Sequence, residues 1–402
     1  MRILFLTPGF PYPPIWGFGI RVYELIRLLS RGHVVSLLTY EEPGEAEKMA
    51  AMKEVCAAVH TVPRAPETER SKRLAQLFSI FSPVSYQRRS LYSRRMQDAL
   101  NELTSKERFD VIQIESSQLA GFEFDRRPVR VLDEHNIEYE LLYRMYLTER
   151  SATRRCYNWL EFTKFRREEI RSWRSVSGCV STSAREERIM RDLVPEKPIL
   201  VAPNAVNIAY FHPSDEDLTD LNCLVMTGLM HYRPNTDGAL FFVKEILPHI
   251  LASRPNTVFY VVGAGATEEL KRAASPHVVI TDTVPDVRPY VYKSAVFVVP
   301  LRMGGGTRLK VLEGLAMEKA VVTTSVGCEG IDVTHGEHLL IADEPRAFAD
   351  AVLGLLGDRD LRLGLGTRGR ALVERQYRWE TVVEKLEGFY DRLLTAQRAT
   401  PR

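Results

Sequence analysis

An apolar run, a triple-glycine turn and a helix entry follow one another in the second half of this chain. Residues 295–300 form a short apolar run, which predicts a buried strand, and residues 312–317 predict a helix. Gly304, Gly305 and Gly306 lie between them and let the backbone come close to a ligand. Because the first amides of a helix have no partner within the helix, a strand, a glycine turn and a helix in this order predict an anion site.

The residues that follow the glycines add charge to this turn. Thr307 and the cations Arg308 and Lys310 suit a diphosphate, and Glu313 lies three residues after Lys310. In the alternative interpretation, Lys310 and Glu313 form a solvated surface pair worth a few tenths of a kcal/mol, and the glycines only make a turn. Taken alone, the run leaves both interpretations open.

The whole chain alternates short apolar runs with helical patterns, which predicts an α/β fold with doubly wound parallel sheets. In the first half, helices are expected at 19–30, in much of 136–175, and from residue 184. The expected strands are 3–7, 33–39, 110–114, 129–133, 178–181 and 199–202, then 224–228, 257–262, 278–281, 296–300, 320–324 and 339–341.

Turn residues at 203–207 and 211–215 interrupt this alternation and predict a hinge between two domains. We therefore expect an N-terminal Rossmann-like domain at 1–205 and a C-terminal one at 206–378. The last helix, about 379–396 within the segment 379–402, is amphipathic and long enough to pack back on the first domain. Open parallel sheets bind ligands at the carboxyl ends of their strands, so two facing sheets predict a site in the cleft between them.

Composition excludes several classes of protein. The 402 residues carry a net charge of only +2, and no nucleic-acid-binding motif accompanies the basic residues, so nucleic acid is not an expected partner. The five cysteines lack metal-ligand or disulfide spacing, which indicates reduced thiols and a cytoplasmic protein. The first apolar run is short and followed by prolines, so a signal peptide or membrane span is not expected. Any membrane contact would be peripheral.

Basic residues gather in the first half of the chain. Arg88, Arg89, Arg94 and Arg95 form one group, and the helical segment 154–174 carries seven more beside aromatic residues. These stretches suit an anionic membrane surface, at the inner face of which a lipid-linked acceptor would lie. Equally, Glu161, Glu168 and Glu169 would balance part of the charge on a solvated helix.

Two glycines open the first expected helix of the N-terminal domain. Gly17 and Gly19 follow the first strand, where their amides would approach a phosphate or sugar, although a tight turn explains them as well. Arg21 lies on the first turn of that helix, where it would meet an anionic acceptor or a diphosphate, or simply be exposed.

Four motifs together resemble the family 4 retaining glycosyltransferases of GT-B fold. They are the run from Gly304 to Glu313, Pro203-Asn-Ala-Val-Asn207, Pro11-Tyr-Pro-Pro14 with Gly17-Phe-Gly19 and Arg21, and Gly32-His-Val34. The resemblance covers nearly the whole chain and implies metal-independent transfer from a nucleotide-diphosphate sugar of UDP or GDP type. It also implies a donor held mainly by the C-terminal domain, an acceptor held mainly by the N-terminal domain, and no cofactor besides the donor.

The resemblance assigns roles to several donor-site residues. Glu313 matches the second glutamate of the family's E-x7-E motif, which accepts hydrogen bonds from the ribose hydroxyls. Position 305 should hold the first glutamate but is Gly305, so amides of the 304–307 loop would replace it. Backbone near Val284 would contact the base.

The resemblance also implies charges that this chain lacks. After Gly228, Leu229 and Pro234 stand where many relatives carry an arginine and a lysine. We expect Arg308 and Lys310 to neutralise the departing diphosphate in their place.

His135 follows the strand at 129–133 and matches a histidine that relatives place beside the donor sugar. The resemblance implies a hydrogen bond to a sugar hydroxyl rather than acid–base work. Asp215 and Asp217 offer a D-x-D pair, but they lie in a polar loop without a preceding strand, so no metal site is expected.

The leading interpretation is a retaining glycosyltransferase acting on a hydroxyl of a glycan, a lipid-linked glycan or a small metabolite. An epimerase or phosphorylase of the same fold is the first alternative. A catalytically silent nucleotide-sugar binding protein is the second, since Gly305 replaces the first glutamate.

Overall fold

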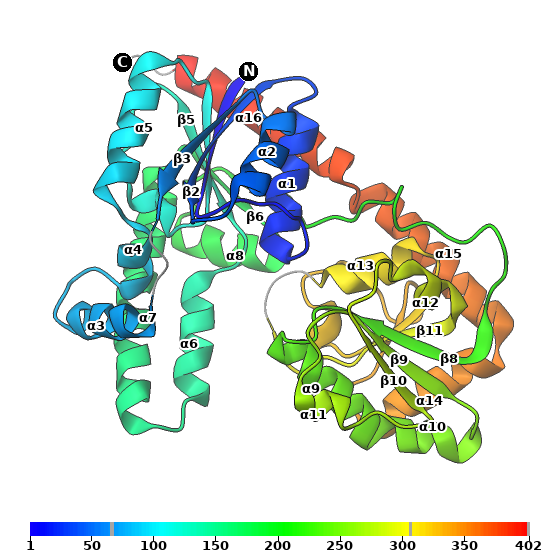
Figure 1. Ribbon diagram of the computed structural model, residues 1–402. Coiled ribbons are helices and arrows are strands. Elements are labelled where there is room, and N and C mark those ends of the chain that lie inside the picture. Colours follow the sequence, from blue (N-terminus) through cyan, green and yellow to red (C-terminus); the bar gives the residue numbers. More distant parts are fainter. Residues whose placement is uncertain (65–67, 305–307, 400–402) are drawn as a thin grey trace. The chain divides into compact units, whose positions relative to one another are not determined.

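The computed structural model describes residues 1–64, 68–304 and 308–399 (Figure 1). They form two compact units. Unit 1 comprises Met1–Pro203 and the C-terminal segment that starts at Val383, and unit 2 comprises Asn204–Val382. Gly305, Gly306 and Thr307 of the predicted anion site lie outside the described residues.

Unit 1 is built on a seven-stranded sheet in the order β3-β2-β1-β4-β5-β6-β7. Every pair of neighbours is parallel. The strand order changes direction between β1 and β4, the place where open sheets of this kind bind ligands. The strands are β1 (Arg2–Thr7), β2 (Val34–Glu41), β3 (Ala58–Pro63), β4 (Val111–Glu115), β5 (Val129–Glu134), β6 (Gly178–Ser181) and β7 (Ile199–Val201).

Helices connect these strands in the order that a doubly wound sheet requires. Those of unit 1 are α1 (Gly17–Leu29), α2 (Ala46–Val55), α3 (Glu69–Ile80), α4 (Tyr86–Leu91), α5 (Arg94–Lys106), α6 (Glu138–Thr148), α7 (Ala152–Ser175) and α8 (Ala184–Leu193), with a 3-10 turn at Leu119–Gly121.

Sequence patterns missed one strand of this sheet. β3 lies at the sheet edge and is mostly half-buried, with His60 and Pro63 among its residues. Because an edge strand needs neither an unbroken apolar run nor a hydrogen-bonding amide at each position, it gives a weak pattern.

The carboxylates of α7 lie inside the unit rather than on a solvated face as one interpretation expected, although Glu161 pairs with Lys164 of the same helix at 3.7 Å. Glu161, Glu168 and Glu169 are buried. Glu169 accepts hydrogen bonds from the amides of Glu138 and Tyr139, both at 2.9 Å, and so caps the start of α6. Glu168 accepts one from the amide of Ser85 at 2.9 Å. The acidic residues of α7 face inward, and its arginines face solvent.

Unit 2 is built on a second parallel sheet, in the order β10-β9-β8-β11-β12-β13. Its strands are β8 (Asp220–Thr227), β9 (Val258–Val262), β10 (Val278–Asp282), β11 (Ser294–Val299), β12 (Ala320–Thr323) and β13 (Leu340–Ile341). Its helices are α9 (Arg233–Phe241), α10 (Leu247–Ser253), α11 (Glu268–Lys271), α12 (Arg288–Lys293), α13 (Leu309–Ala316), α14 (Pro345–Gly357) and α15 (Arg359–Gln376), with a π turn at Phe242–Ile246 and a 3-10 turn at Val326–Cys328.

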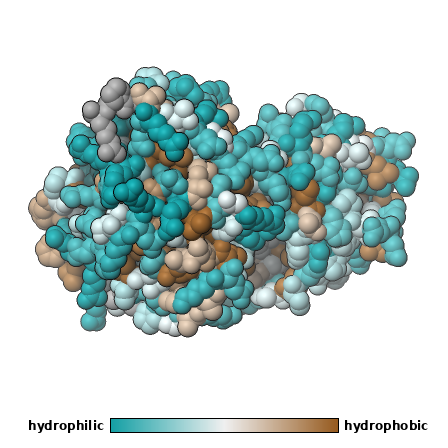
Figure 2. Space-filling view, turned by 90° about the horizontal axis from the view of Figure 1, so that it is seen from above, coloured by the Kyte–Doolittle hydropathy of each residue, from teal (hydrophilic) through white to brown (hydrophobic). Residues whose placement is uncertain are grey.

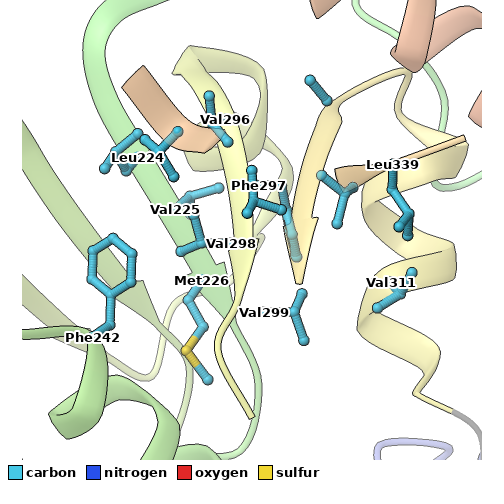
Figure 3. Close-up of a cluster of buried hydrophobic side chains, with 14 of the residues drawn as sticks. Leu224, Val225, Met226, Phe242, Val296, Phe297, Val298, Val299, Val311 and Leu339 are labelled. Atoms are coloured by element: carbon cyan, nitrogen blue, oxygen red, sulfur yellow. The ribbon is translucent and has the colours of Figure 1, made fainter. Parts of the chain in front are cut away.

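The core of unit 2 surrounds β8 and β11 (Figure 3). Val296, Phe297, Val298 and Val299 are fully buried, with side chains on both faces of the sheet. Burial on both faces explains why this strand reads as an unbroken apolar run. It also fixes the point at which the glycine turn leaves the sheet.

The last helix, α16 (Trp379–Ala399), begins in unit 2 and belongs to unit 1 from Val383 on. The Tyr390 hydroxyl donates to Gln113 Oε1 at 2.9 Å, and Glu387 contacts His33 at 2.8 Å. The predicted return of this helix to the first domain is confirmed. Among the described helices, none combines the length and apolar character that crossing a membrane would require.

We expect Gly263→Ala to destabilise the protein strongly. Gly263 has φ +139°, and a Cβ there would lie 2.0 Å from the carbonyl oxygen of Gly228. Strain and overlap together should cost roughly 2–4 kcal/mol and lower the melting temperature. Gly354→Ala is the control, because a Cβ meets nothing within 4 Å on the exposed face of α14. An equal melting temperature for both variants would contradict this packing.

Candidate functional site

The donor-site candidates of unit 2 lie at the carboxyl ends of neighbouring strands. Gly228 directly follows β8, and Gly304 follows β11, which pairs with β8. Val284 follows β10 at the same edge of the sheet, two strands away from β8. Gly228 and Gly304 therefore follow neighbouring strands, whereas Val284 follows a strand two places away from β8.

Gly228 is required by its surroundings. Its φ is +145°, and a Cβ there would lie 2.8 Å from both the Asn235 amide nitrogen and the Lys310 ammonium. A side chain at position 228 would occupy the space in which the ammonium sits. The glycine therefore makes room for a cation at the end of β8.

Lys310 reaches from α13 to the loop after β8. Its Nζ donates to Asn235 Oδ1 at 2.6 Å, and the Asn235 amide donates to the carbonyl of Leu229 at 2.8 Å. Lys310 is half-buried, and burial lowers its pKa to about 7, with the charge of Arg308 acting in the same direction. The ammonium thus lies beside Leu229, one of the two positions at which the family resemblance implies a charged residue that this chain lacks.

Arg308 is the residue immediately before α13 and is buried. Its Nε donates to the carbonyl of Val326 at 3.3 Å, and a Cβ on Gly304, whose φ is +134°, would lie 2.9 Å from its guanidinium. Gly304 therefore lies directly against the guanidinium, with no room for a side chain. This side chain adds a second cationic group to the same edge of the sheet.

Glu313 lies on α13 one turn after Lys310 and is half-buried. Burial raises its pKa to about 7, while the charge of Lys310 lowers it. Within the described residues, no ion pair joins Lys310 to Glu313, because the ammonium is turned toward Asn235. The solvated surface pair of the alternative interpretation is therefore absent from this part of the structure.

Asn235 was missed by sequence reasoning. It follows Pro234 at the start of α9, where only charged residues were sought. Pro at the first turn of a helix with an amide beside it is a common helix start, so the sequence offers no signal that this amide orients a lysine 75 residues later.

In unit 1, the two candidate glycines differ. A Cβ on Gly19 would lie 3.1 Å from the carbonyl of Pro11 and from the ring of Trp16, whereas a Cβ on Gly17 would meet nothing within 4 Å. Gly19 therefore holds the loop at residues 11–16 close to α1. Gly17 leaves open space at the start of the helix.

Arg21 is neither exposed nor directed to a ligand, contrary to expectation. It is buried, and its guanidinium donates to both oxygens of Asp133 at 2.9 Å and to the carbonyl of Ala202 at 2.9 Å. One side chain of α1 thus joins the ends of β5 and β7. Its role is structural, because the N–H groups that form the buried bidentate pair with Asp133 are not available to a ligand.

His135 lies just beyond β5 and contacts a buried acid. Its Nε2 is 2.7 Å from Glu115 Oε2, and its ring centroid is 5.1 Å from that of Phe18. Burial and the charge of Asp133 raise the pKa of Glu115, while His135 lowers it. Glu115 was not a candidate, although β4 pairs with β5 in a register that sets Glu115 opposite Asp133.

Ligand-type atoms of Glu115, Asp133 and His135 lie within 4.8 Å of one another. Both oxygens of Asp133 already accept from Arg21, and one oxygen of Glu115 contacts His135. We assign these residues to a hydrogen-bonded network that holds the His135 ring. Asp217 of the D-x-D pair is exposed and accepts from the amide of Thr219 at 3.2 Å in its own turn.

Comparison with known proteins shows that part of this chain is similar to the glycosyltransferases of group 1. The family model described as "Glycosyl transferases group 1" matches residues 222–358, which lie within unit 2.

Two of the relatives that match by sequence show the extent of the similarity. An uncharacterized 44.6 kDa protein in the cps region of Klebsiella pneumoniae is 24% identical over 88% of this chain and 90% of its own length. The capsular polysaccharide biosynthesis glycosyltransferase CapM of Staphylococcus aureus is 29% identical over 54% of this chain and 61% of its own.

The fold itself is shared with solved GT-B structures. Alr3699/HepE from Anabaena, solved in complex with UDP and glucose, matches with a TM-score of 0.67 and 12% identity, covering 97% of this chain and 99% of its own. The predicted fold class, two parallel-sheet Rossmann-like domains of GT-B type, is confirmed.

We expect Arg21→Met to destabilise unit 1. The change leaves Asp133 buried without its cationic partner, and breaking a buried pair in this way costs about 3–5 kcal/mol. Unfolding in urea would measure the loss. The double variant Arg21→Met/Asp133→Leu removes both charges and should recover much of it. A single variant as stable as the unchanged protein would contradict the structural role.

The raised pKa of Glu313 predicts a pH-dependent stability. The ordinary pKa of 4.5 rises to about 7 in the folded protein, so the folded state binds the proton more tightly than the unfolded state. The contribution of Glu313 to the stability of the ligand-free protein should therefore fall as the pH rises from 4.5 to about 7. Glu313→Gln removes this titration. The melting temperature of the unchanged protein minus that of the variant should decrease between these pH values, and a constant or rising difference would contradict the burial of this carboxyl.

Proposed function

We propose that this protein is a retaining glycosyltransferase that uses a nucleotide-diphosphate sugar of UDP or GDP type and needs no metal. The observation that carries the proposal is the seating of the Lys310 ammonium between Gly228 and Asn235, at the end of β8. A cation held there, with Arg308 beside Gly304, suits a diphosphate, and it lies in the unit that matches the group 1 family model.

Lys310 and Arg308 would stabilise the diphosphate as it departs. Negative charge develops on the leaving phosphate, and cations already fixed in place stabilise that charge without reorganising. A bound diphosphate would also raise the lowered pKa of Lys310 and keep its ammonium charged. Lys310 itself should therefore take up a proton when a donor binds near pH 7.

Glu313 would bind the ribose of the donor. A carboxylate accepts two hydrogen bonds side by side, which matches a vicinal diol. Because burial raises its pKa to about 7, the hydroxyls would have to stabilise its charged form. Gly304 and Gly228 would let the backbone approach the phosphates, Gly305, Gly306 and Thr307 would contribute loop amides, and Val284 would lie near the base.

Unit 1 would bind the acceptor and contact the donor sugar. His135, held by Glu115, would hydrogen-bond a sugar hydroxyl, and the helix entry at Gly17 and Gly19 offers backbone amides. Retention of configuration would follow from attack on the face from which the phosphate leaves, with that phosphate accepting the proton of the acceptor. The acceptor would be a hydroxyl of a glycan, a lipid-linked glycan or a small metabolite in the cytoplasm.

A thermal-shift panel with UDP, GDP and ADP, each with its nucleoside as reference, tests the donor site. The correct nucleoside diphosphate at 100 times its dissociation constant should stabilise the protein by about 2.7 kcal/mol. Glu313→Ala should abolish the shift, because the ribose contact is lost. Lys310→Met and Arg308→Ala should weaken the diphosphate far more than the nucleoside. Lys293→Met, at an exposed position of unit 2, is the charge-matched control. Unchanged shifts in all three site variants would contradict the proposed site.

Turnover of labelled donors separates transfer from its alternatives. Slow donor hydrolysis supports transfer, epimer formation supports an epimerase, and binding without turnover supports a silent binding protein in which Gly305 has ended catalysis. His135→Ala should lower kcat roughly tenfold or more while leaving the nucleotide thermal shift unchanged. Equal loss of binding and turnover would contradict a sugar contact by His135.

A further inference from the structure

Helix α3 presents its apolar residues to solvent. Leu74, Leu77, Phe78 and Phe81 are 55, 58, 64 and 90% exposed. They follow the spacing i, i+3, i+4, i+7, so they form one continuous stripe along the helix and the residue after it. The opposite side, which faces the protein, holds Ala75, Gln76 and the fully buried Ser79. The usual orientation of an amphipathic helix is therefore reversed.

Polar contacts with α7 hold α3 in this orientation. The Ser79 hydroxyl donates to Glu161 Oε1 at 3.1 Å, and the Lys164 ammonium donates to the Ser79 carbonyl at 2.5 Å. The hydroxyl of Thr68 accepts from the amide of Ser71 at 3.2 Å and caps the helix start. The buried Glu161 thus orients α3 so that the apolar stripe points outward.

Arginines flank the stripe on the same face. Arg70 lies four residues before Leu74, and Arg73 lies four residues before Leu77, which places both beside the stripe. Both are exposed. Residues 70–97 contain seven Lys or Arg and no Asp or Glu. We define the α3 surface as Arg70, Arg73, Leu74, Leu77, Phe78 and Phe81.

Helices α6 and α7 also expose large apolar side chains. Trp159 on α7 is 50% exposed and Met145 on α6 is 54% exposed, and the amide of Asn158 contacts the Met145 carbonyl at 3.4 Å. α3 lies against α7, and α6 lies beside α7 (Figure 1). Figure 2 shows hydrophobic side chains at the left-hand edge of the molecule, the side on which Figure 1 places α3.

We propose that the α3 surface binds an anionic lipid bilayer, with the stripe among the acyl chains near the headgroups and Arg70 and Arg73 on the lipid phosphates. An apolar face flanked by arginines is the arrangement by which a helix lies in a membrane interface. A second copy of this chain fits less well, because two such surfaces would bring like charges together without an acidic residue in residues 70–97 to pair with them.

The α3 surface is independent of the donor site. It lies in unit 1, whereas the diphosphate cations lie in unit 2. It extends the proposed function by favouring a lipid-linked acceptor. Binding to lipid can be measured without donor or acceptor, so failure of one proposal does not decide the other.

Flotation of the full-length protein with vesicles tests the surface. Phosphatidylcholine vesicles that contain phosphatidylglycerol should bind the protein, vesicles of phosphatidylcholine alone should bind it far less, and salt should weaken binding. Leu77→Glu/Phe78→Glu should lower binding about tenfold or more, because apolar insertion is lost and negative charge is added. Arg70→Gln/Arg73→Gln should lower the preference for phosphatidylglycerol.

Matched controls exclude a general effect of surface changes. Leu361→Glu/Leu363→Glu places two charges at exposed leucines of α15, which are 37 and 47% exposed, and should leave vesicle binding unchanged. The nucleotide thermal shift should be the same in all these variants, since they lie outside the donor site. Equal binding by the Leu77→Glu/Phe78→Glu variant would overturn the proposal. So would a dimer of the unchanged protein that this double substitution separates.

Discussion

The buried pair of Arg21 and Asp133 is the interaction on which the functional edge of unit 1 depends. Asp133 is the second-last residue of β5, and Arg21 joins it to α1 and to the carbonyl of Ala202 beyond β7. Glu115 lies opposite Asp133 on β4, so the position of Glu115, and through it the His135 ring, rests on this pair. Removing two charges from water is costly, and only the bidentate geometry and the additional carbonyl contact repay that cost. The pair therefore fixes geometry more than it adds stability.

The proposed donor site of unit 2 is governed by burial rather than by a buried ion pair. Burial brings the pKa values of Lys310 and Glu313 from opposite directions to about 7, so both charged forms are disfavoured in the absence of ligand. In such a site, the charged forms of Lys310 and Glu313 are poorly solvated. An anion bound to the ammonium and a diol bound to the carboxylate would stabilise them. The same burial that weakens the empty site strengthens each contact that a donor would make, because charges interact more strongly where water is excluded.

Sequence patterns were sufficient for the fold because strands buried on both faces, such as β11, leave long apolar runs, and glycine turns mark their ends. They were insufficient for contacts made across the sheet. Glu115 lies just after the strand expected at 110–114, and Asn235 lies beside Pro234, where only a charged residue was sought. Neither role is visible without the pairing of β4 with β5 or the reach of Lys310. Arg21 was misread for the same reason: a first-turn arginine is usually exposed, and only the Asp133 carboxylate beneath it reverses that expectation. The edge strand β3 was missed because half-burial leaves little periodicity.

Helix α7 shows why charge counted along a sequence differs from charge presented at a surface. Its glutamates appeared to offset its arginines, yet Glu161, Glu168 and Glu169 are buried, where they hold α3, the start of α4 and the start of α6. These carboxylates accept hydrogen bonds inside the unit, whereas the arginines of α7 are exposed. The outer face of α7 is therefore more basic than its composition, and the same Glu161 contact turns the apolar stripe of α3 outward beside it. One set of buried acids thus produces both the basic and the apolar character of this face of unit 1.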